Sequence, residues 1–172
     1  VEYLPNIVPV EDEEISKQLE RSFKKAGIKI MTSSEVTKVD TNGDGCKVTV
    51  KTPKGEKVLE ADIVLSAVGV QANIENIGLE ALGIKTEKGK ITVDDFYKTS
   101  VDVYYAIGDC VPGQSLAHVA SAEGIICVEK IAGHHPEPLN YGNIPGCTYA
   151  SPEIASVGMT EKAAKEAGYD IK

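Results

Sequence analysis

The sequence predicts an α/β fold, the rear part of a doubly wound nucleotide-binding domain that carries a β-meander. Three observations predict it. An amphipathic helix pattern follows Glu11, polar turns separate short strands over residues 35–60, and a continuous apolar run covers Ala61–Gly69. Such a run is typical of a strand buried on both faces of a parallel sheet, the kind of sheet that doubly wound folds contain.

Length and composition fit one domain or two small ones. The chain has 172 residues, of which 42% are hydrophobic and 26% charged, with a formal net charge of −8. The acidic charge argues against nucleic-acid binding, which requires a basic surface to neutralise phosphates. No apolar run reaches the roughly 18–20 residues of a membrane span, and the start at Val1 lacks the pattern of a signal peptide. We therefore expect a soluble protein without membrane partners.

The cysteines predict a reducing compartment. Cys46, Cys110, Cys127 and Cys147 are widely spaced and form neither a CxxC nor a CxxxxC pair. This spacing suggests no zinc site and no local redox disulfide, so we interpret the four as small packing residues. In a long charged chain the pattern favours a cytoplasmic location over a disulfide-stapled secreted fold.

The first elements alternate between strand and helix. Val1–Leu4 is predicted to be the end of a strand that has no earlier strand to pair with. The helix after Glu11 is closed by Gly27, and Ile28–Met31 follows as a short strand. The apolar residues of this helix recur every three or four positions and form one stripe: Ile15, Leu19, Phe23 and Ala26.

A β-meander is predicted next. Glu35–Thr41 and Cys46–Thr52 flank Asn42–Gly45, a strong hairpin signal because Asn and Gly tolerate positive φ. A second turn at Pro53–Gly55 leads into the strand Lys57–Glu60. The apolar run then follows.

Shorter elements are expected after the apolar run. Asn76–Gly83 is predicted as a loop or short helix, and Lys90–Val93 and Val103–Ile107 as short strands. A long helix is predicted from Ser115 to Ala132, interrupted at Gly124.

The last part of the chain is predicted to form a separate module. His134–Pro138 breaks the long helix and forms a linker, and Cys147–Ala150 has the composition of a strand. Thr160–Ala167 is predicted as a helix whose first residue is the N-cap and whose C-cap is Gly168. Another strand is expected to start at Tyr169–Ile171. Because the opening strand lacks a partner and the last module is unfinished, we expect this sequence to be a piece of a larger chain.

Two positions indicate contacts to a dinucleotide. Glu2 lies at the carboxyl end of the opening strand, where an acidic residue accepts hydrogen bonds from the ribose of NAD and repels the 2′-phosphate of NADP. The ordinary alternative is a solvated surface glutamate. Gly69 ends the apolar run, and a missing side chain there lets a cofactor approach the backbone. The alternative is a plain turn at a strand end.

The sharpest candidate site is the segment Tyr104–Asp109. Gly108 permits close approach at a strand end, and Asp109 is placed to accept hydrogen bonds from polyol hydroxyls. A helix opens shortly after, and its free N–H groups suit an electron-rich edge such as that of a reduced flavin. An ordinary strand–turn–helix remains the alternative. The helix-opening residues are Ser115, Leu116, Ala117 and His118.

Four segments together resemble the dihydrolipoyl dehydrogenase family of flavoprotein disulfide reductases. They begin with VEYLP and the helix that follows it, and continue with ADIVLSAVG, YAIGDCVPGQSLAHVASAEG and YASPEIASVGMTE. The Gly-Asp turn alone is shared with glutathione reductases, mercuric reductases and NADH oxidases. VEYLP and the following EDEEISKQLE point to the NAD-using lipoamide branch.

The resemblance implies a fold and three domains. The fold would be the rear part of a doubly wound FAD/NAD(P)-binding fold with a β-meander, plus the start of an α+β interface domain. Residues 1–70 would end the NAD-binding domain, residues 71–143 would form the central domain with the FAD-contacting Gly-Asp motif, and residues 144–172 would begin the interface domain.

The resemblance also implies cofactor contacts residue by residue. Glu2 matches the acid on the adenosine ribose of NAD, and Val36 matches a residue beside the adenine. Gly69 matches the glycine that contacts the nicotinamide dinucleotide, although Val70–Asn73 departs from the Arg-x-Pro-Asn that often follows it. Asp109 matches the aspartate on the ribitol-diphosphate side of FAD. The segment along the pyrimidine edge of the flavin is matched by Ser115, Leu116, Ala117 and His118.

The implied activity belongs to the family's whole subunit. That subunit oxidises dihydrolipoamide through an active-site disulfide and FAD, and delivers hydride to NAD. Its partners would be a second subunit in a homodimer and the lipoyl domains of 2-oxo acid dehydrogenase or glycine cleavage complexes. The chain contains no CxxxxC pair, no His-Glu base and no GxGxxG loop, so we expect it to be inactive alone. The alternatives are a non-catalytic interaction or structural module derived from the reductase scaffold, and a different disulfide reductase or NADH oxidase branch.

Overall fold

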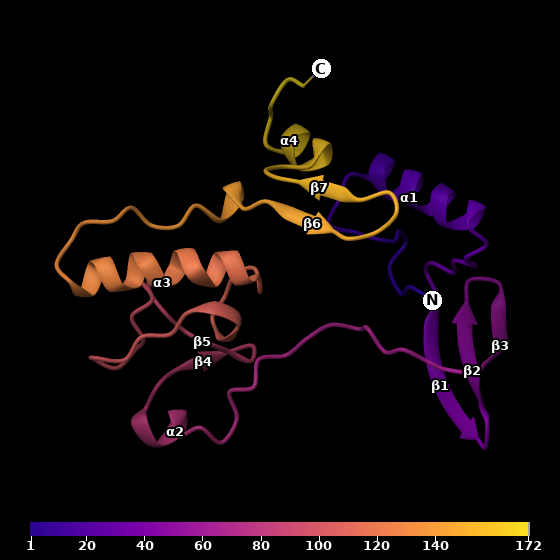
Figure 1. Ribbon diagram of the computed structural model, residues 1–172, viewed down its shortest axis with the longest axis horizontal. Helices are drawn as coiled ribbons and strands as arrows, with labels where there is room; N and C mark the ends of the chain where they lie inside the picture. Colours follow the sequence, from indigo (N-terminus) through magenta and orange to yellow (C-terminus); the bar gives the residue numbers. More distant parts are fainter. Residues whose placement is uncertain (172) are drawn as a thin grey trace. The chain divides into compact units, whose positions relative to one another are not determined.

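The computed structural model describes residues 1–171 and divides into two compact units (Figure 1). The first unit combines Val1–Ala67 with the chain from Pro145 onward, and the second is Val68–Ile144. Each unit has its own helices; among the described residues, the first contains two small sheets and the second contains one. None of the helices within residues 1–171 is long and apolar enough to cross a bilayer.

Helix α1, Glu13–Lys25, forms where the sequence predicts it. Acidic residues occupy its first turn and lysines its last, which matches the helix dipole. Gly27 continues the chain at φ 88°, and the Ile28 N–H bonds back to Phe23 O at 2.9 Å, which closes the helix end. The predicted apolar stripe is only partly buried. Leu19 is buried but Ile15 is exposed, because the covered face of α1 also contains Ser16, whose hydroxyl donates to Val8 O in the preceding loop.

The opening segment has backbone partners, so the expectation of an unpaired strand at Val1–Leu4 is wrong. The Glu2 N–H donates to Met31 O at 2.7 Å, and the Ser34 N–H donates to Glu2 O at 3.0 Å. The Ser33 N–H donates to Leu4 O at 2.9 Å. The two segments that flank α1 in sequence therefore lie side by side. Neither Val1–Leu4 nor Ile28–Met31 forms a regular strand, so the predicted strand at Ile28–Met31 is also wrong.

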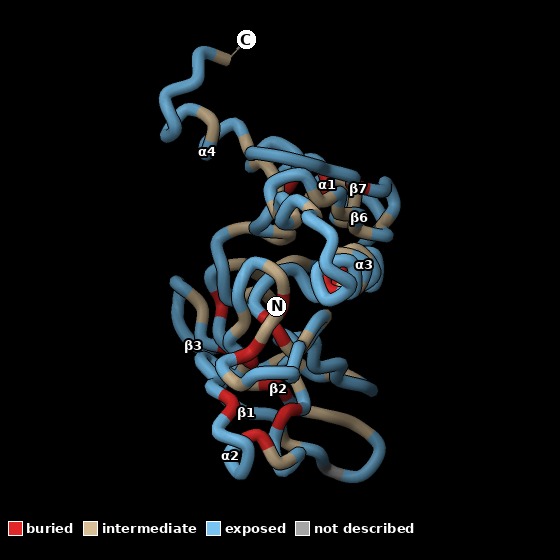
Figure 2. The backbone as a smooth tube through the Cα atoms, turned by 90° about the vertical axis from the view of Figure 1, so that its left-hand side faces the viewer, coloured by how far each residue is buried: buried red, intermediate tan, exposed pale blue. Residues whose placement is uncertain are grey.

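The β-meander is confirmed. β1 (Glu35–Asn42), β2 (Gly45–Thr52) and β3 (Gly55–Ala61) form an antiparallel sheet in the order β1-β2-β3. Asn42 pairs with Gly45 across the first turn, and Thr52 pairs with Gly55 across the second. The central strand supplies the buried side chains, Val48 and Val50, which belong to the residues drawn red in Figure 2.

The prediction that Ala61–Gly69 is a strand buried on both faces is wrong for this structure. From Asp62 on, the backbone forms no strand, and Ile63, Leu65 and Val68 are 84%, 87% and 95% exposed. The physical reason is that a strand in the interior of a sheet requires a neighbour on each side. No strand of residues 1–171 pairs with this segment, so its apolar side chains lie in solvent.

The second unit is built around a small apolar cluster and one long helix. α2 (Leu79–Leu82) confirms the predicted short helix, and β4 (Thr86–Glu87) pairs with β5 (Lys90–Ile91). α3 (Ala117–Ile131) confirms the predicted long helix, which runs through Gly124 without interruption. The core cluster is formed by Ile74, Leu79, Ile84 and Ile91.

The predicted strand Val103–Ile107 is reduced to a single bridge between Lys98 and Tyr105. A 3-10 turn follows it at Gly108–Cys110, and a second lies at Tyr141–Asn143. Short bridges of this kind position loops rather than build a sheet. The candidate site residues of this unit therefore lie on loops and on the start of α3.

The last module confirms a strand and a helix. β6 (Gly146–Thr148) pairs with β7 (Ile154–Ser156), and α4 covers Glu161–Glu166. Thr160 is the N-cap, with its hydroxyl accepting from the Ala163 N–H at 3.2 Å. The strand expected at Tyr169–Ile171 does not form; Lys172 lies outside the described residues.

Candidate functional site

The Gly108–Asp109 turn packs directly against helix α3. Gly108 has φ 75°, a left-handed conformation that a residue with a Cβ rarely adopts. A Cβ added at Gly108 would lie 3.2 Å from the Cβ of Ala120 on α3. Glycine at this position therefore allows both the turn and its close approach to the helix.

Asp109 presents its carboxylate to solvent beside the start of α3. The side chain is exposed, and no hydrogen bond or ion pair within residues 1–171 uses its carboxylate. The backbone of the turn is held by Lys90, whose Nζ donates to Asp109 O and lies 3.4 Å from Ser115 Oγ. The structure thus brings together two of the predicted site residues, Asp109 and Ser115, through one lysine from β5.

The start of α3 is not capped by a side chain. Leu116 is the N-cap in an extended conformation, and the Ala120 N–H donates to Leu116 O at 3.0 Å. Ser115, Ala117 and His118 are exposed around it. A helix N-terminus carries partial positive charge that favours electron-rich groups.

These groups fit a flavin. A Cβ-free turn allows close approach, the Asp109 carboxylate can accept from ribitol hydroxyls, and a positive helix end suits the pyrimidine edge of the ring. Those are the roles that the family resemblance implies for Asp109 and for the residues that open α3.

A buried carboxylate lies beneath the turn, and sequence reasoning missed it. Glu123 of α3 accepts from the Gly108 N–H at 2.5 Å and from the Tyr141 hydroxyl at 2.6 Å. The Tyr141 and Tyr97 hydroxyls lie 3.4 Å apart. Burial, and then the hydrogen bond to Glu123, raises the pKa of Tyr141; burial also raises the pKa of Tyr97.

A sequence signal for Glu123 does exist. Val119, Glu123 and Cys127 recur every four residues and are all buried on one face of α3. A charged residue in an otherwise apolar stripe of a helix must have a partner in the interior, because an unpaired buried charge is costly. The sequence does not indicate that the partners are Gly108 and Tyr141.

The residues predicted to contact NAD are divided between the units. In the first unit, Glu2 is half-buried, and one of its carboxylate oxygens accepts from the Leu4 N–H at 2.8 Å. The other oxygen has no hydrogen bond within residues 1–171, so the carboxylate fits a ribose diol. Val36 is exposed on β1, opposite Val50. In the second unit, Gly69 has φ 121° and open space where a Cβ would lie.

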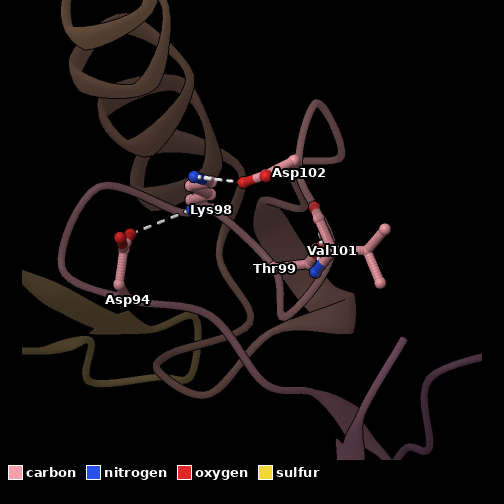
Figure 3. Close-up of polar contacts among 5 residues, drawn as sticks. All are labelled: Asp94, Lys98, Thr99, Val101 and Asp102. Atoms are coloured by element: carbon pink, nitrogen blue, oxygen red, sulfur yellow. Dashed lines mark hydrogen bonds and ion pairs between the residues drawn. The ribbon is translucent and has the colours of Figure 1, made fainter. Parts of the chain in front are cut away.

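A polar turn in the second unit is a structural support (Figure 3). Asp94 Oδ1 accepts from the Lys98 N–H at 3.0 Å, and the Lys98 Nζ lies 2.7 Å from Asp102 Oδ1. That hydrogen bond raises the pKa of Lys98 and lowers the pKa of Asp102. Thr99 Oγ1 bonds both the N–H and the C=O of Val101. Each of these charges has a partner within the turn, and no cluster of the described His, Cys, Asp and Glu residues fits a metal ion.

Two family models match the chain. Residues 1–124 match the family described as pyridine nucleotide-disulphide oxidoreductase. Residues 144–172 match the dimerisation domain of the same family. Together the matches cover both units.

Several curated proteins similar to this chain are named dihydrolipoyl dehydrogenase. A dihydrolipoyl dehydrogenase from Rhizobium etli is 49% identical over the whole chain, and one from Zymomonas mobilis is 46% identical. A protein with a different name, a leghemoglobin reductase from Glycine max, is 41% identical. The chain spans 36% of the length of the Rhizobium protein and 33% of that from Glycine max.

Solved structures confirm the predicted fold class. LpdA from Mycobacterium tuberculosis aligns over 96% of this chain, and 36% of its own, with a TM-score of 0.86 and 28% identity. The flavoprotein disulfide reductase RclA from Escherichia coli aligns over 99% of this chain, and 38% of its own, with a TM-score of 0.89 and 24% identity. Both likenesses extend over nearly all of this chain.

Proposed function

The chain belongs to the pyridine nucleotide-disulphide oxidoreductase family, and we propose that it is the part of a dihydrolipoyl dehydrogenase that contacts FAD and NAD. The observation that carries the proposal is identity of 49% over the whole chain to a protein of that name. The Gly108–Asp109 turn, whose free carboxylate lies beside the start of α3, supplies the matching chemistry.

We propose three functional parts. Residues 1–70 end the NAD-binding domain, residues 71–143 form the central domain, and residues 144–172 begin the interface domain. The match to the dimerisation domain begins at residue 144 and supports the start of the last part. The match over residues 1–124 spans the first two parts, and the division of the compact units between Ala67 and Val68 supports separating them. The last part also supports a homodimer as the assembled form.

The flavin contacts are proposed for the second unit. Asp109 would accept hydrogen bonds from the ribitol side of FAD, and Lys90 would keep that turn beside the helix start. The isoalloxazine of FAD supplies the electron transfer when it is bound. The helix start would stabilise its pyrimidine edge through backbone groups of Ser115, Leu116, Ala117 and His118.

The NAD contacts are proposed for Glu2, Val36 and Gly69. Glu2 would bond the adenosine ribose with the carboxylate oxygen that Leu4 leaves free, and its charge would disfavour NADP. Val36 offers an exposed apolar surface for the adenine. Gly69 leaves open space at the backbone for the dinucleotide.

The whole enzyme is proposed to oxidise dihydrolipoamide on the lipoyl domains of 2-oxo acid dehydrogenase or glycine cleavage complexes. Its electrons would pass through a disulfide and FAD to NAD. Residues 1–172 contain no CxxxxC pair. Exchange with dihydrolipoamide requires an active-site disulfide, and all four cysteines of this segment are free thiols, so we propose that this segment alone is catalytically silent. The four free cysteines support a reducing, cytoplasmic location.

The test is an assay of the full-length protein with free dihydrolipoamide, following NADH formation, with NADP in parallel. The proposal predicts flavin in the purified protein, activity with NAD and little with NADP. Reduction of glutathione disulfide in place of dihydrolipoamide oxidation would assign another reductase branch. A full-length protein with neither flavin nor activity would favour the non-catalytic module.

A further inference from the structure

The strongest unexplained feature of the second unit is the buried carboxylate of Glu123. The residue is 1% exposed, and its neighbours along the same face of α3, Val119 and Cys127, are buried apolar side chains. A carboxylate in such a place persists only when hydrogen bonds replace the water that it has lost.

Both oxygens of the carboxylate are used, and each reaches a different part of the chain. Oε2 accepts from the Gly108 N–H at 2.5 Å, fifteen residues earlier in sequence. Oε1 accepts from the Tyr141 hydroxyl at 2.6 Å, eighteen residues later. Glu123 therefore links the turn before α3 to the segment after it.

Tyr141 holds the same loop at a second point. Its ring lies against Gly113, where an added Cβ would be 2.7 Å from Cε1. The loop from Gly108 to Gly113 is thus fixed at one end by the carboxylate of Glu123 and at the other by the ring of Tyr141. Asp109, with its exposed carboxylate, lies between these two points.

We propose that Glu123, held by Tyr141, is a positioning residue that orients the Gly108–Asp109 turn for the flavin. The inference rests on the proposed function, because it concerns the same flavin contact. Glu123 acts through the Gly108 N–H and makes no contact with the ligand. Removing the carboxylate frees the amide that fixes the turn, so the Asp109 side chain loses its orientation and flavin binding weakens.

A purely structural role for Glu123 predicts something different. A core residue that only stabilises α3 would lower the stability of the protein without a selective effect on the turn. Cys127 provides the matched control, since it is buried one helical turn further along the same face and bonds neither Gly108 nor Tyr141.

The experiment uses the full-length protein and its variants Glu123→Ala, Glu123→Gln, Tyr141→Phe and Cys127→Ala. Two quantities are measured: the dissociation constant of FAD, and the hydrogen-exchange rate of the Gly108 amide in the flavin-free form. Loss of a hydrogen bond to a charged group predicts an increase of about tenfold or more in the FAD dissociation constant of Glu123→Ala. Its Gly108 amide should exchange faster.

The other variants decide between the two roles. Glu123→Gln keeps a carbonyl oxygen for the Gly108 N–H, so it should restore most of the flavin affinity. Cys127→Ala should leave both quantities within about twofold of the wild type. Tyr141→Phe should give an intermediate increase in the dissociation constant, and this variant decides the matter if Glu123→Ala does not fold.

The proposal is overturned if Glu123→Ala or Tyr141→Phe leaves both quantities unchanged, or if Cys127→Ala weakens flavin binding as much as Glu123→Ala. Failure of the proposed function gives a separate result, a wild-type protein that holds no flavin. The exchange of the Gly108 amide still tests the positioning role in that case.

Discussion

Substitution of Gly108 by alanine tests the packing of the turn against α3. The residue has φ 75°, and the left-handed conformation costs a residue with a Cβ about 1–2 kcal/mol. The new methyl group would also lie 3.2 Å from the Cβ of Ala120, a contact that the helix or the turn must relieve by moving. Overpacking of this kind adds about 1 kcal/mol, so the expected loss of unfolding free energy is about 2–3 kcal/mol.

Gly133 offers a matched control at the other end of α3. Its φ is 85°, and a Cβ there meets nothing within 4 Å. Gly133→Ala therefore carries the cost of the left-handed backbone without the contact, about 1–2 kcal/mol. The difference between the unfolding free energies of the two variants therefore measures the contact between the turn and the helix.

The assay is equilibrium urea unfolding of both variants and the wild type under the same conditions. We expect Gly108→Ala to lose about 1 kcal/mol more than Gly133→Ala. An equal or smaller loss for Gly108→Ala would refute the reasoning, because the close approach to Ala120 would then have no energetic consequence.

Three further predictions concern stability. The pKa of Tyr141 is raised in the folded protein, so its hydroxyl ionises at lower pH in the unfolded chain. The free energy of unfolding should therefore fall as the pH rises above about 10. In a series of urea melts at increasing pH, Tyr141→Phe should reduce that fall. Because the pKa of Asp102 is lowered by Lys98, the stability from this pair should be present at neutral pH and lost as the pH falls below about 4. Because the side chain of Asp102 is 89% exposed, solvent screens the pair, and Asp102→Asn should change the acid limb of the same series only slightly. A large change would contradict this prediction. Thr160→Ala removes the side-chain cap of α4 and should cost about 1 kcal/mol; unchanged helix protection in hydrogen exchange would contradict that value.

Elements defined by local chemistry could be predicted from the sequence. α1, the turns of the meander, α2, α3 and α4 follow from short patterns of charge, glycine and apolar spacing. Val103–Ile107 and Ala61–Gly69 could not, because a strand forms only where another segment supplies hydrogen-bond partners, and composition does not show whether that partner is present.

In the candidate site, too, features set by neighbouring residues could be predicted and contacts with distant residues could not. Gly108, Asp109 and the start of α3 could be predicted because the turn and the helix opening are adjacent in sequence. The contacts of Glu123 depend on Tyr141 and on the Gly108 backbone, which only the folded chain brings to the same carboxylate. Lys90 was missed for the same reason, since it reaches the turn from β5.

The role of the Gly108–Asp109 turn as a flavin contact is tested by measuring the FAD dissociation constant of full-length Asp109→Ala beside that of Asp102→Ala. Both residues are exposed aspartates of the second unit, but Asp102 bonds only Lys98 in the supporting turn. We expect Asp109→Ala to raise the FAD dissociation constant about tenfold or more, whereas Asp102→Ala should bind FAD like the wild type. Equal flavin affinity in the two variants would contradict the assignment of the Gly108–Asp109 turn as the flavin contact.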